Sequence, residues 1–276
     1  MKFLFDEAIY NPLYNLLIGI YNFFPFHDFG IAIIIVTIII KFLLIPLSKK
    51  QIESQKKMQE LQPKIKELQT KYKDNKEKQS RALMELYKEN KTNPFSGCLP
   101  TIIQIIFFMT FYRILFNVGN MNFNTDINTL YDFMHNPEQI NNTFLGFINI
   151  AERVNFNGVS MASLFISPLV TLSNFFAIIY NNQAHSILAI LAALSQYFQM
   201  KMLMAKQALA PKKDGEEPDF AQIMSKQMLF LGPVMTFLLG ISFPAGLALY
   251  WLTSTVFMII QQQYLQKKQL ITEKKG

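Results

Sequence analysis

Long apolar stretches alternate with polar ones along the chain. The first, Phe29–Leu47, has nineteen residues, nearly all of them Ile, Leu, Val, Phe or Ala, and contains one charge, Lys41. A helix of this length rises about 28 Å, close to the roughly 30 Å of a bilayer's hydrocarbon core. Comparable stretches follow at Leu99–Val118, Ile187–Ala205, Met228–Phe243 and Leu247–Tyr264. This pattern predicts five transmembrane helices, of which the last two form a tight hairpin.

One long polar stretch, Ser48–Ser96, interrupts this pattern. Apolar residues recur in it at helical spacings of three and four, first at Met58, Leu61, Ile65, Leu68 and Tyr72 and then at Leu83, Leu86 and Tyr87. A turn at Lys73–Lys76 separates the two sets. The spacing predicts an antiparallel helical hairpin, and Pro63 is expected to kink its first arm.

The N-terminal region, residues 1–28, is apolar but too short between its breaks to span a membrane. Asn11, Asn15, Gly19 and Asn22 follow one another at spacings of four, four and three, which places them in one stripe of a helix. We interpret this region as an amphipathic helix that lies in the membrane interface. A secretory signal peptide is the alternative, although acids follow Lys2 and no small-residue cleavage site is evident.

Composition supports a membrane protein and disfavours an enzyme. Of the 276 residues, 51% are hydrophobic and only 16% are charged, which is typical of a polytopic membrane protein. The one cysteine, Cys98, excludes an internal disulfide framework, and its position argues against an N-terminal lipoprotein anchor. The three histidines have no partners at metal-ligand spacing, and the predicted spans hold no carboxylate. We therefore expect no cofactor, no metal and no enzymatic activity.

The charges in the loops predict the orientation of the chain. Ser48–Ser96, Lys201–Gln227 and the tail from Tyr264 together hold 22 of the 26 basic residues, whereas Ile114–Gln183 holds one, against four acids. By the positive-inside rule, the first three regions are cytoplasmic and the fourth is external. A sixth span at Ser160–Tyr180 would put the tail or the hairpin on the wrong side, so we expect that segment to lie in the interface or to pack on the external face.

Lys41 gives the clearest functional signal. It lies about 10 Å inside the first predicted span, where insertion of an ammonium costs roughly 2.5–3.5 kcal/mol. Lys41 either snorkels to the membrane surface or faces a hydrated cavity, and Thr37, one turn earlier, favours the cavity. Gln104 in the second span and Gln196 and Gln199 in the third either make interhelical hydrogen bonds or line the same cavity.

Three stretches resemble one family closely. PLSKKQIESQKKMQELQPKIKELQTKY enters the polar hairpin, LYKENKTNPFSGCLPTIIQIIFF leaves it, and FPAGLALYWLTSTVFMIIQQQYL forms the last predicted span. These stretches are similar to the YidC-type membrane protein insertases, a group that includes the mitochondrial oxidase-assembly and chloroplast Albino proteins. The resemblance covers about Asn11 to Gln266 and is weakest over Asn120–Tyr180. The large periplasmic domain of proteobacterial members has no counterpart in this sequence.

The resemblance implies an all-α polytopic membrane protein with five transmembrane helices around a hydrophilic groove that is open to the cytoplasm. A cytoplasmic helical hairpin and an N-terminal interfacial helix complete this fold. We expect the groove to be lined by Lys41, Thr37, Gln104, Gln199, Gln196, Tyr250 and Trp251. Lys41 takes the position of the family's groove cation, and Trp251 is deep enough to cap the outer end of the groove.

The implied function is to help hydrophobic helices and their short polar tails enter the bilayer, independently of the Sec translocon or beside it. Implied partners are nascent membrane proteins, membrane lipids, the Sec translocon, and the ribosome through the hairpin and basic tail. The implied location is the bacterial cytoplasmic (inner) membrane, with the N-terminus outside and the C-terminus in the cytoplasm. A secondary transporter or channel that uses Lys41 in a substrate cavity is the alternative, and a chaperone that holds spans without inserting them is a third hypothesis.

These inferences divide the chain into ten segments. They are the external interfacial helix 1–28, the spans 29–48, 97–118, 184–205, 227–243 and 244–264, the cytoplasmic hairpin 49–96, the external loop 119–183, the cytoplasmic loop 206–226 and the basic tail 265–276.

Overall fold

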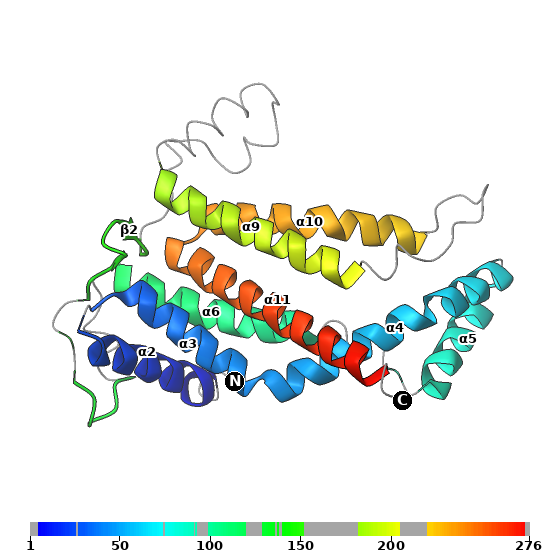
Figure 1. Ribbon diagram of the computed structural model, residues 1–276, viewed down its shortest axis with the longest axis horizontal. Helices are drawn as coiled ribbons and strands as arrows, with labels where there is room; N and C mark the ends of the chain where they lie inside the picture. The colour runs from blue at the N-terminus through cyan, green and yellow to red at the C-terminus, as the bar shows by residue number, and fades with distance from the viewer. Residues whose placement is uncertain are drawn as a thin grey trace, which may run out of the picture.

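The protein is mostly helical, as the sequence predicts. The computed structural model describes residues 5–25, 27–73, 75–90, 92, 99–119, 129–135, 137, 140–151, 182–204 and 220–273. The helical elements are η1 (Asp6–Tyr10), α2 (Asn11–Phe23), α3 (Phe29–Leu43), α4 (Ile45–Lys71), α5 (Lys76–Glu89), α6 (Leu99–Gly119), α9 (Gln183–Met204), α10 (Phe220–Ser242) and α11 (Ala245–Glu273) (Figure 1). The predicted interfacial segment Ser160–Tyr180 lies outside the described residues.

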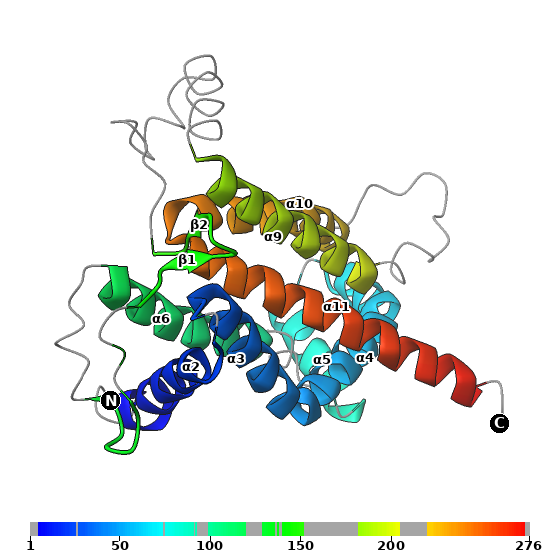
Figure 2. The ribbon, with the colours of Figure 1, turned by 60° about the vertical axis from the view of Figure 1, so that its left-hand side comes forward.

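Helix α11 occupies the centre of the helical bundle. It packs against α3, α6, α9 and α10, and it lies between the α9–α10 pair on one side and α3 with α6 on the other (Figure 2). Pro244 joins α10 to α11 because its missing N–H ends one helix while its carbonyl accepts from Leu247 N at 2.9 Å. The side chains of α11 therefore determine whether each contact at the centre of the bundle is polar or apolar.

The first predicted span is not one continuous helix. Helix α3 ends at Leu43, α4 begins at Ile45, and the two axes differ by 63°. Pro46 explains the break, because its ring removes a backbone donor and crowds the carbonyl of Phe42. The expectation of one continuous helix over Phe29–Leu47 is thus wrong. The depth of about 10 Å for Lys41 was calculated along that helix and no longer follows from it, because Lys41 lies in the last turn of α3.

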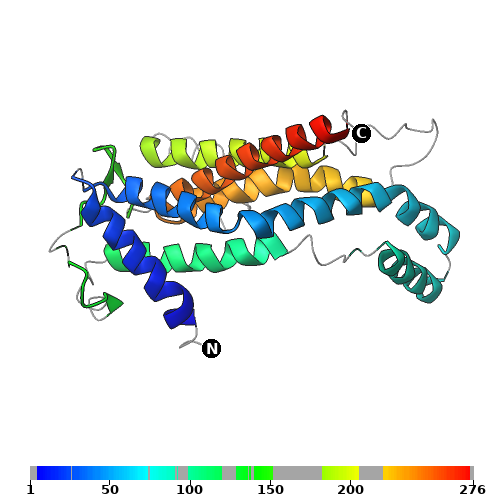
Figure 3. The ribbon, with the colours of Figure 1, turned by 60° about the horizontal axis from the view of Figure 1, so that its bottom comes forward.

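Helices α4 and α5 lie side by side as two arms (Figure 3). Leu61, Ile65 and Leu86 form a small buried cluster between them, and Leu68, Leu83 and Tyr87 pack against it. Asn75 caps the start of α5 by accepting from Lys78 N at 3.0 Å. This cluster is separate from the bundle core. Among the described residues, the two arms are joined by this cluster and by a hydrogen bond from Gln79 Nε2 to Gln69 O at 2.9 Å.

The polar stripe of α2 serves a different purpose from the one predicted. Asn15 is only 2% exposed; its Nδ2 donates to Thr129 O and its Oδ1 accepts from Tyr131 N, both at 2.8 Å. Asn22 Nδ2 donates to His135 O at 2.6 Å. The stripe therefore holds the segment that follows α6, and the opposite face of α2 packs on α3.

A small β-hairpin departs from the all-α prediction. Strands β1 (Thr143–Phe144) and β2 (Ile148–Asn149) pair antiparallel. The turn between them needs left-handed backbone at Leu145 (φ 53°) and Gly146 (φ 80°). Strands of two residues carry too little alternation to be found in a sequence.

Length and hydropathy mark two candidate spans among the described residues. Helix α9 is long and apolar enough over Gln183–Leu203, and the bent pair α3–α4 is so when its two parts are taken together. The apolar parts of α6 and α10, Ile102–Val118 and Leu229–Ser242, are shorter. The five-span count is therefore not established by these criteria.

Candidate functional site

Lys41 points its ammonium at a sulfur atom on the central helix. Its Nζ lies 3.7 Å from Met258 Sδ on α11, and the side chain is half-buried. A thioether is a weak acceptor, and in the described part of the chain no carboxylate pairs with this cation. The C-terminal end of α3 supplies some compensation, because the helix dipole favours a positive charge there.

Gln199 reaches the same sulfur from a second helix. Its Nε2 lies 3.5 Å from Met258 Sδ, and the side chain is 7% exposed. Met258 thus joins Lys41 of α3 to Gln199 of α9. The two residues were predicted to share a cavity, and the structure brings them to one atom.

Gln104 of α6 lies one helical turn further along α11. Its Oε1 accepts from Ser254 Oγ at 3.3 Å, and the side chain lies beside the phenol of Tyr250. Its Nε2 is buried and has no partner among the described residues. Because Tyr250, Ser254 and Met258 are spaced by four, they form one face of α11 with about 6 Å between successive residues. We call Lys41, Gln104, Gln199, Ser254 and Met258 the polar cluster.

Thr37 and Gln196 are less involved than predicted. Thr37 is 1% exposed, and its hydroxyl donates to Ile33 O in its own helix at 2.6 Å. The hydroxyl proton of Thr37 is therefore used within α3 and is not donated to the polar cluster. Gln196 is half-buried, and the structure records no contact between it and the polar cluster within the described ranges.

The predicted aromatic pair does not act as one unit. Tyr250 is buried and stacks on Phe111, with ring centroids 4.6 Å apart. Trp251 faces another direction and makes a T-shaped contact with Phe108, with the ring centroids 5.7 Å apart. Phe108 in turn contacts Phe243, at the end of α10, at 5.3 Å. Tyr250 therefore borders the polar cluster, while Trp251 belongs to an aromatic group between α6 and the α10–α11 turn.

Sequence analysis missed two members of the polar cluster. Ser254 could have been found, because it stands with Thr253 and Thr255 inside an apolar stretch and lies four residues after Tyr250. Met258 gave no signal, because a methionine in an apolar helix has no polar group to mark it. Its role follows only from the positions of Lys41 and Gln199.

The opposite end of the bundle is closed by packing. A Cβ on Gly30 would collide with the ring and the Cβ of Phe144. Asp28 caps α3 by accepting from Ile31 N, and its second oxygen accepts from Leu145 N at 2.7 Å. We call this region the sealed end. It extends to the start of α11, where Gly246 N donates to Ile150 O at 2.9 Å.

The fold and the polar cluster define an α-helical bundle in which four largely apolar helices, α3, α6, α9 and α11, contribute polar side chains to one interior site. The family model described as 60Kd inner membrane protein matches residues 19–273, and the chain belongs to this family, the YidC-type group that the sequence motifs indicated.

Curated relatives agree with this assignment. The chain is 31% identical over 261 residues to a protein of Brucella suis biovar 1 (strain 1330) named Membrane protein insertase YidC. The aligned region covers 95% of this chain and 36% of that protein. It is 31% identical over 237 residues to the Streptomyces avermitilis protein of the same name, covering 86% and 50%. It is 34% identical over 241 residues to Inner membrane protein ALBINO3, chloroplastic, of Arabidopsis thaliana, covering 87% and 47%. The chain thus spans about a third to a half of the length of these relatives.

Proposed function

We propose that the chain is a membrane protein insertase, which helps hydrophobic helices and their short polar tails to enter the bilayer. The names of its relatives support this function. The observation that carries it is the polar cluster, in which Lys41 and Gln199 meet at Met258 while Gln104 binds Ser254 one turn away. No observation favours a transporter or channel.

The proposed topology has five spans. They are α3 with the first turns of α4, then α6, α9, α10 and α11, with the N-terminus outside and the C-terminus in the cytoplasm. The distribution of basic residues supports this orientation. The helices α10 and α11 are included because they pack on α9, and α6 is included because it packs on α11. In this topology the polar cluster faces the cytoplasmic side, and the sealed end faces outward.

The polar cluster is proposed to line a hydrated groove. A buried amide donor without a protein partner costs about 1–3 kcal/mol unless water satisfies it. Gln104 Nε2 is such a donor among the described residues. Water in the groove would shorten the dry path that a polar tail must cross. The remaining barrier lies at the sealed end, which prevents the groove from becoming an open pore.

Lys41 is proposed to attract acidic residues of the incoming tail. Two opposite charges 4 Å apart attract by roughly 4 kcal/mol at an effective dielectric constant of 20, against about 1 kcal/mol in water. The thioether of Met258 holds the ammonium only weakly, and methionine is flexible enough to move aside. A carboxylate can therefore replace the sulfur without breaking an existing ion pair. The apolar part of the substrate then leaves into lipid by its own transfer free energy.

The proposed partners follow from charge. Ser48–Ser96 holds 13 basic and 7 acidic residues, which suits ribosomal RNA or anionic lipid headgroups. Nascent membrane proteins are the substrates, and the Sec translocon is a further partner. The α4–α5 arms would deliver a substrate toward the groove because α4 continues directly from α3.

Reconstitution tests the function. The purified protein in liposomes, with a small single-span protein synthesised alongside, should give a protease-protected tail well above that of empty liposomes. Protection equal to that of empty liposomes would contradict insertion and favour a chaperone that only holds its clients. Gly232→Ala protein is the matched control and should insert as wild type does, since an added Cβ there meets nothing within 4 Å. Gln104→Leu protein, which removes one amide of the polar cluster, should give a smaller protected fraction.

A further inference from the structure

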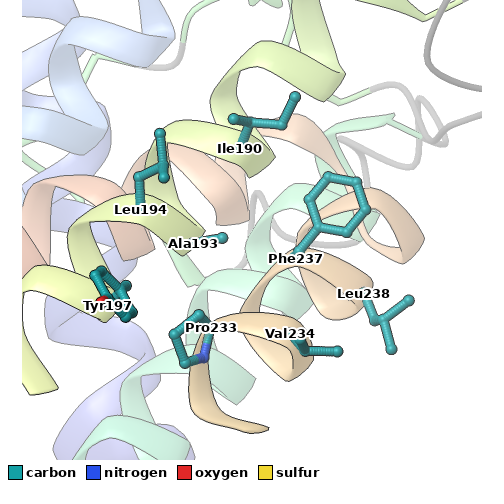
Figure 4. A pocket seen from close by; sticks show the side chains of 8 residues that line it. All are labelled: Ile190, Ala193, Leu194, Tyr197, Pro233, Val234, Phe237 and Leu238. Carbon is teal, nitrogen blue, oxygen red and sulfur yellow. The ribbon is translucent and has the colours of Figure 1, made fainter. Parts of the chain in front are cut away.

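A second concave surface lies away from the polar cluster, between α9 and α10. It is an open surface groove with a volume of about 490 Å³. Its lining comes from Ile190, Ala193, Leu194, Tyr197, Pro233, Val234, Phe237 and Leu238 (Figure 4). We call it the α9–α10 groove.

The groove exists because small side chains stand between large ones. Ala193 contributes only a methyl group to its floor, while Tyr197 and Phe237 stand at its walls (Figure 4). Leu194 and Val234 at its margins are 49% and 53% exposed. The lining is almost wholly carbon, so the surface suits a hydrocarbon chain. The four α9 residues span about 10 Å along the helix.

A cation stands at one end of the groove. Tyr197 meets Phe230 of α10 with ring centroids 6.2 Å apart, and Lys201 places its Nζ 6.0 Å from the Tyr197 ring centroid. Lys201 is exposed and has no carboxylate partner within the described ranges. The groove thus runs from an apolar slot to an aromatic ring and then to an ammonium.

We propose that the α9–α10 groove binds an anionic phospholipid of the cytoplasmic leaflet. One acyl chain lies against Ala193, Tyr197 borders the glycerol region, and the phosphate binds Lys201. The order of these groups matches that of the lipid from its tail to its headgroup, and tyrosine is typical of the boundary between them. The leaflet rests on the proposed topology, in which the end of α9 at Met204 is cytoplasmic.

Lipid retention tests the site without any substrate. Protein released from nanodiscs of equal phosphatidylglycerol and phosphatidylcholine is examined by native mass spectrometry. Wild-type protein should retain phosphatidylglycerol in excess, and Lys201→Gln should lower this excess about fivefold, whereas Lys201→Arg should keep it. Lys267→Gln, which removes an exposed cation from the end of α11, is the matched control and should leave the excess unchanged. Ala193→Leu should lower retention of both lipids.

Three results would overturn the site. Equal retention of both lipids by wild-type protein would exclude headgroup selection. An equal loss in Lys267→Gln and Lys201→Gln would indicate general surface charge, and unchanged retention in Ala193→Leu would exclude the groove.

A photo-crosslinker at Leu194 should label lipid during insertion. Labelling of the nascent chain instead would contradict the lipid site and make the groove a path for the substrate. Because retention needs no insertion, failure of the site and failure of the proposed function are distinguishable.

Discussion

Two cations in the apolar helices are held in opposite ways. Arg113, near the end of α6, pairs with Asp6 and lies 4.0 Å from the Tyr10 ring centroid. Among the described residues, Lys41 has only the thioether of Met258 as a side-chain partner. Arg113 is therefore occupied by groups that stabilise the fold, whereas Lys41 remains available to an incoming anion. The difference separates a structural charge from one that can act on a ligand.

Two buried amides repeat this contrast. Asn15 uses both its oxygen and its nitrogen to hold the segment after α6. Gln104 accepts one hydrogen bond and leaves Nε2 without a partner among the described residues. Protein groups therefore satisfy both polar atoms of Asn15, whereas Gln104 keeps one donor for water or a ligand. Asn142 Oδ1 and Ser186 Oγ, outside the polar cluster, are also buried without a partner among the described residues. Stability and the proposed activity should therefore respond to substitutions in different halves of the bundle.

The largest expected effect on stability is at the sealed end. Gly30→Val would place its side chain against the ring and the Cβ of Phe144. The ring can rotate, but the Cβ cannot move away because Phe144 is part of the β-hairpin. We expect a loss of about 3 kcal/mol in the free energy of unfolding, the upper part of the range for overpacking. Thermal unfolding in detergent measures it. Gly232→Ala is the control, because a Cβ there meets nothing within 4 Å; equal stability of both variants would contradict the packing at this end.

Substitutions of the two amides should have smaller effects on stability, and these effects should be unequal. Asn15→Leu leaves Thr129 O and Tyr131 N without their partner and should cost about 1–3 kcal/mol. Gln104→Met removes a buried donor that has no partner among the described residues, but also the acceptor of the Ser254 hydroxyl, so the loss of stability should be smaller, below about 1 kcal/mol. Hydrogen exchange over residues 129–135 should rise in the first variant only. Destabilisation by Gln104→Met as large as that by Asn15→Leu would remove the contrast.

The two cations should give the smallest difference. Arg113→Met frees Asp6 and loses the contact with Tyr10, and we expect a cost of about 1 kcal/mol because the pair is partly exposed. Lys41→Met should cost nothing in stability, since it loses only a weak contact with sulfur. Parallel thermal melts compare the two variants. A melting temperature that falls more in Lys41→Met than in Arg113→Met would show that Lys41 is structural.

Periodicity and hydropathy predicted the elements that local sequence determines. The seam residues Leu61, Ile65 and Leu86 form the small cluster between α4 and α5. The break at Leu44 was missed because a proline such as Pro46 can either end a helix or stand in the first turn of the next one. Local spacing does not distinguish these two outcomes.

The site was predicted as far as polar residues in apolar helices reveal it. Lys41, Gln104 and Gln199 are visible in the sequence, because each is an exception in its stretch. Met258 is not, and neither is the separation of Tyr250 from Trp251, because both depend on how helices distant in sequence rotate against one another. Asn15 was assigned to the membrane interface for the same reason: its partners lie 114 and 116 residues away.

A charge exchange tests the central claim most directly. Wild-type and Lys41→Glu proteins are reconstituted, and insertion is measured for one substrate with either an acidic or a basic tail. The electrostatic role predicts that Lys41→Glu lowers insertion of the acidic-tail substrate by on the order of tenfold. In this variant, the basic-tail substrate should insert better than the acidic-tail substrate. Lys41→Arg should behave as wild type. Equal insertion of both tails by both proteins would contradict the claim that Lys41 acts on the substrate.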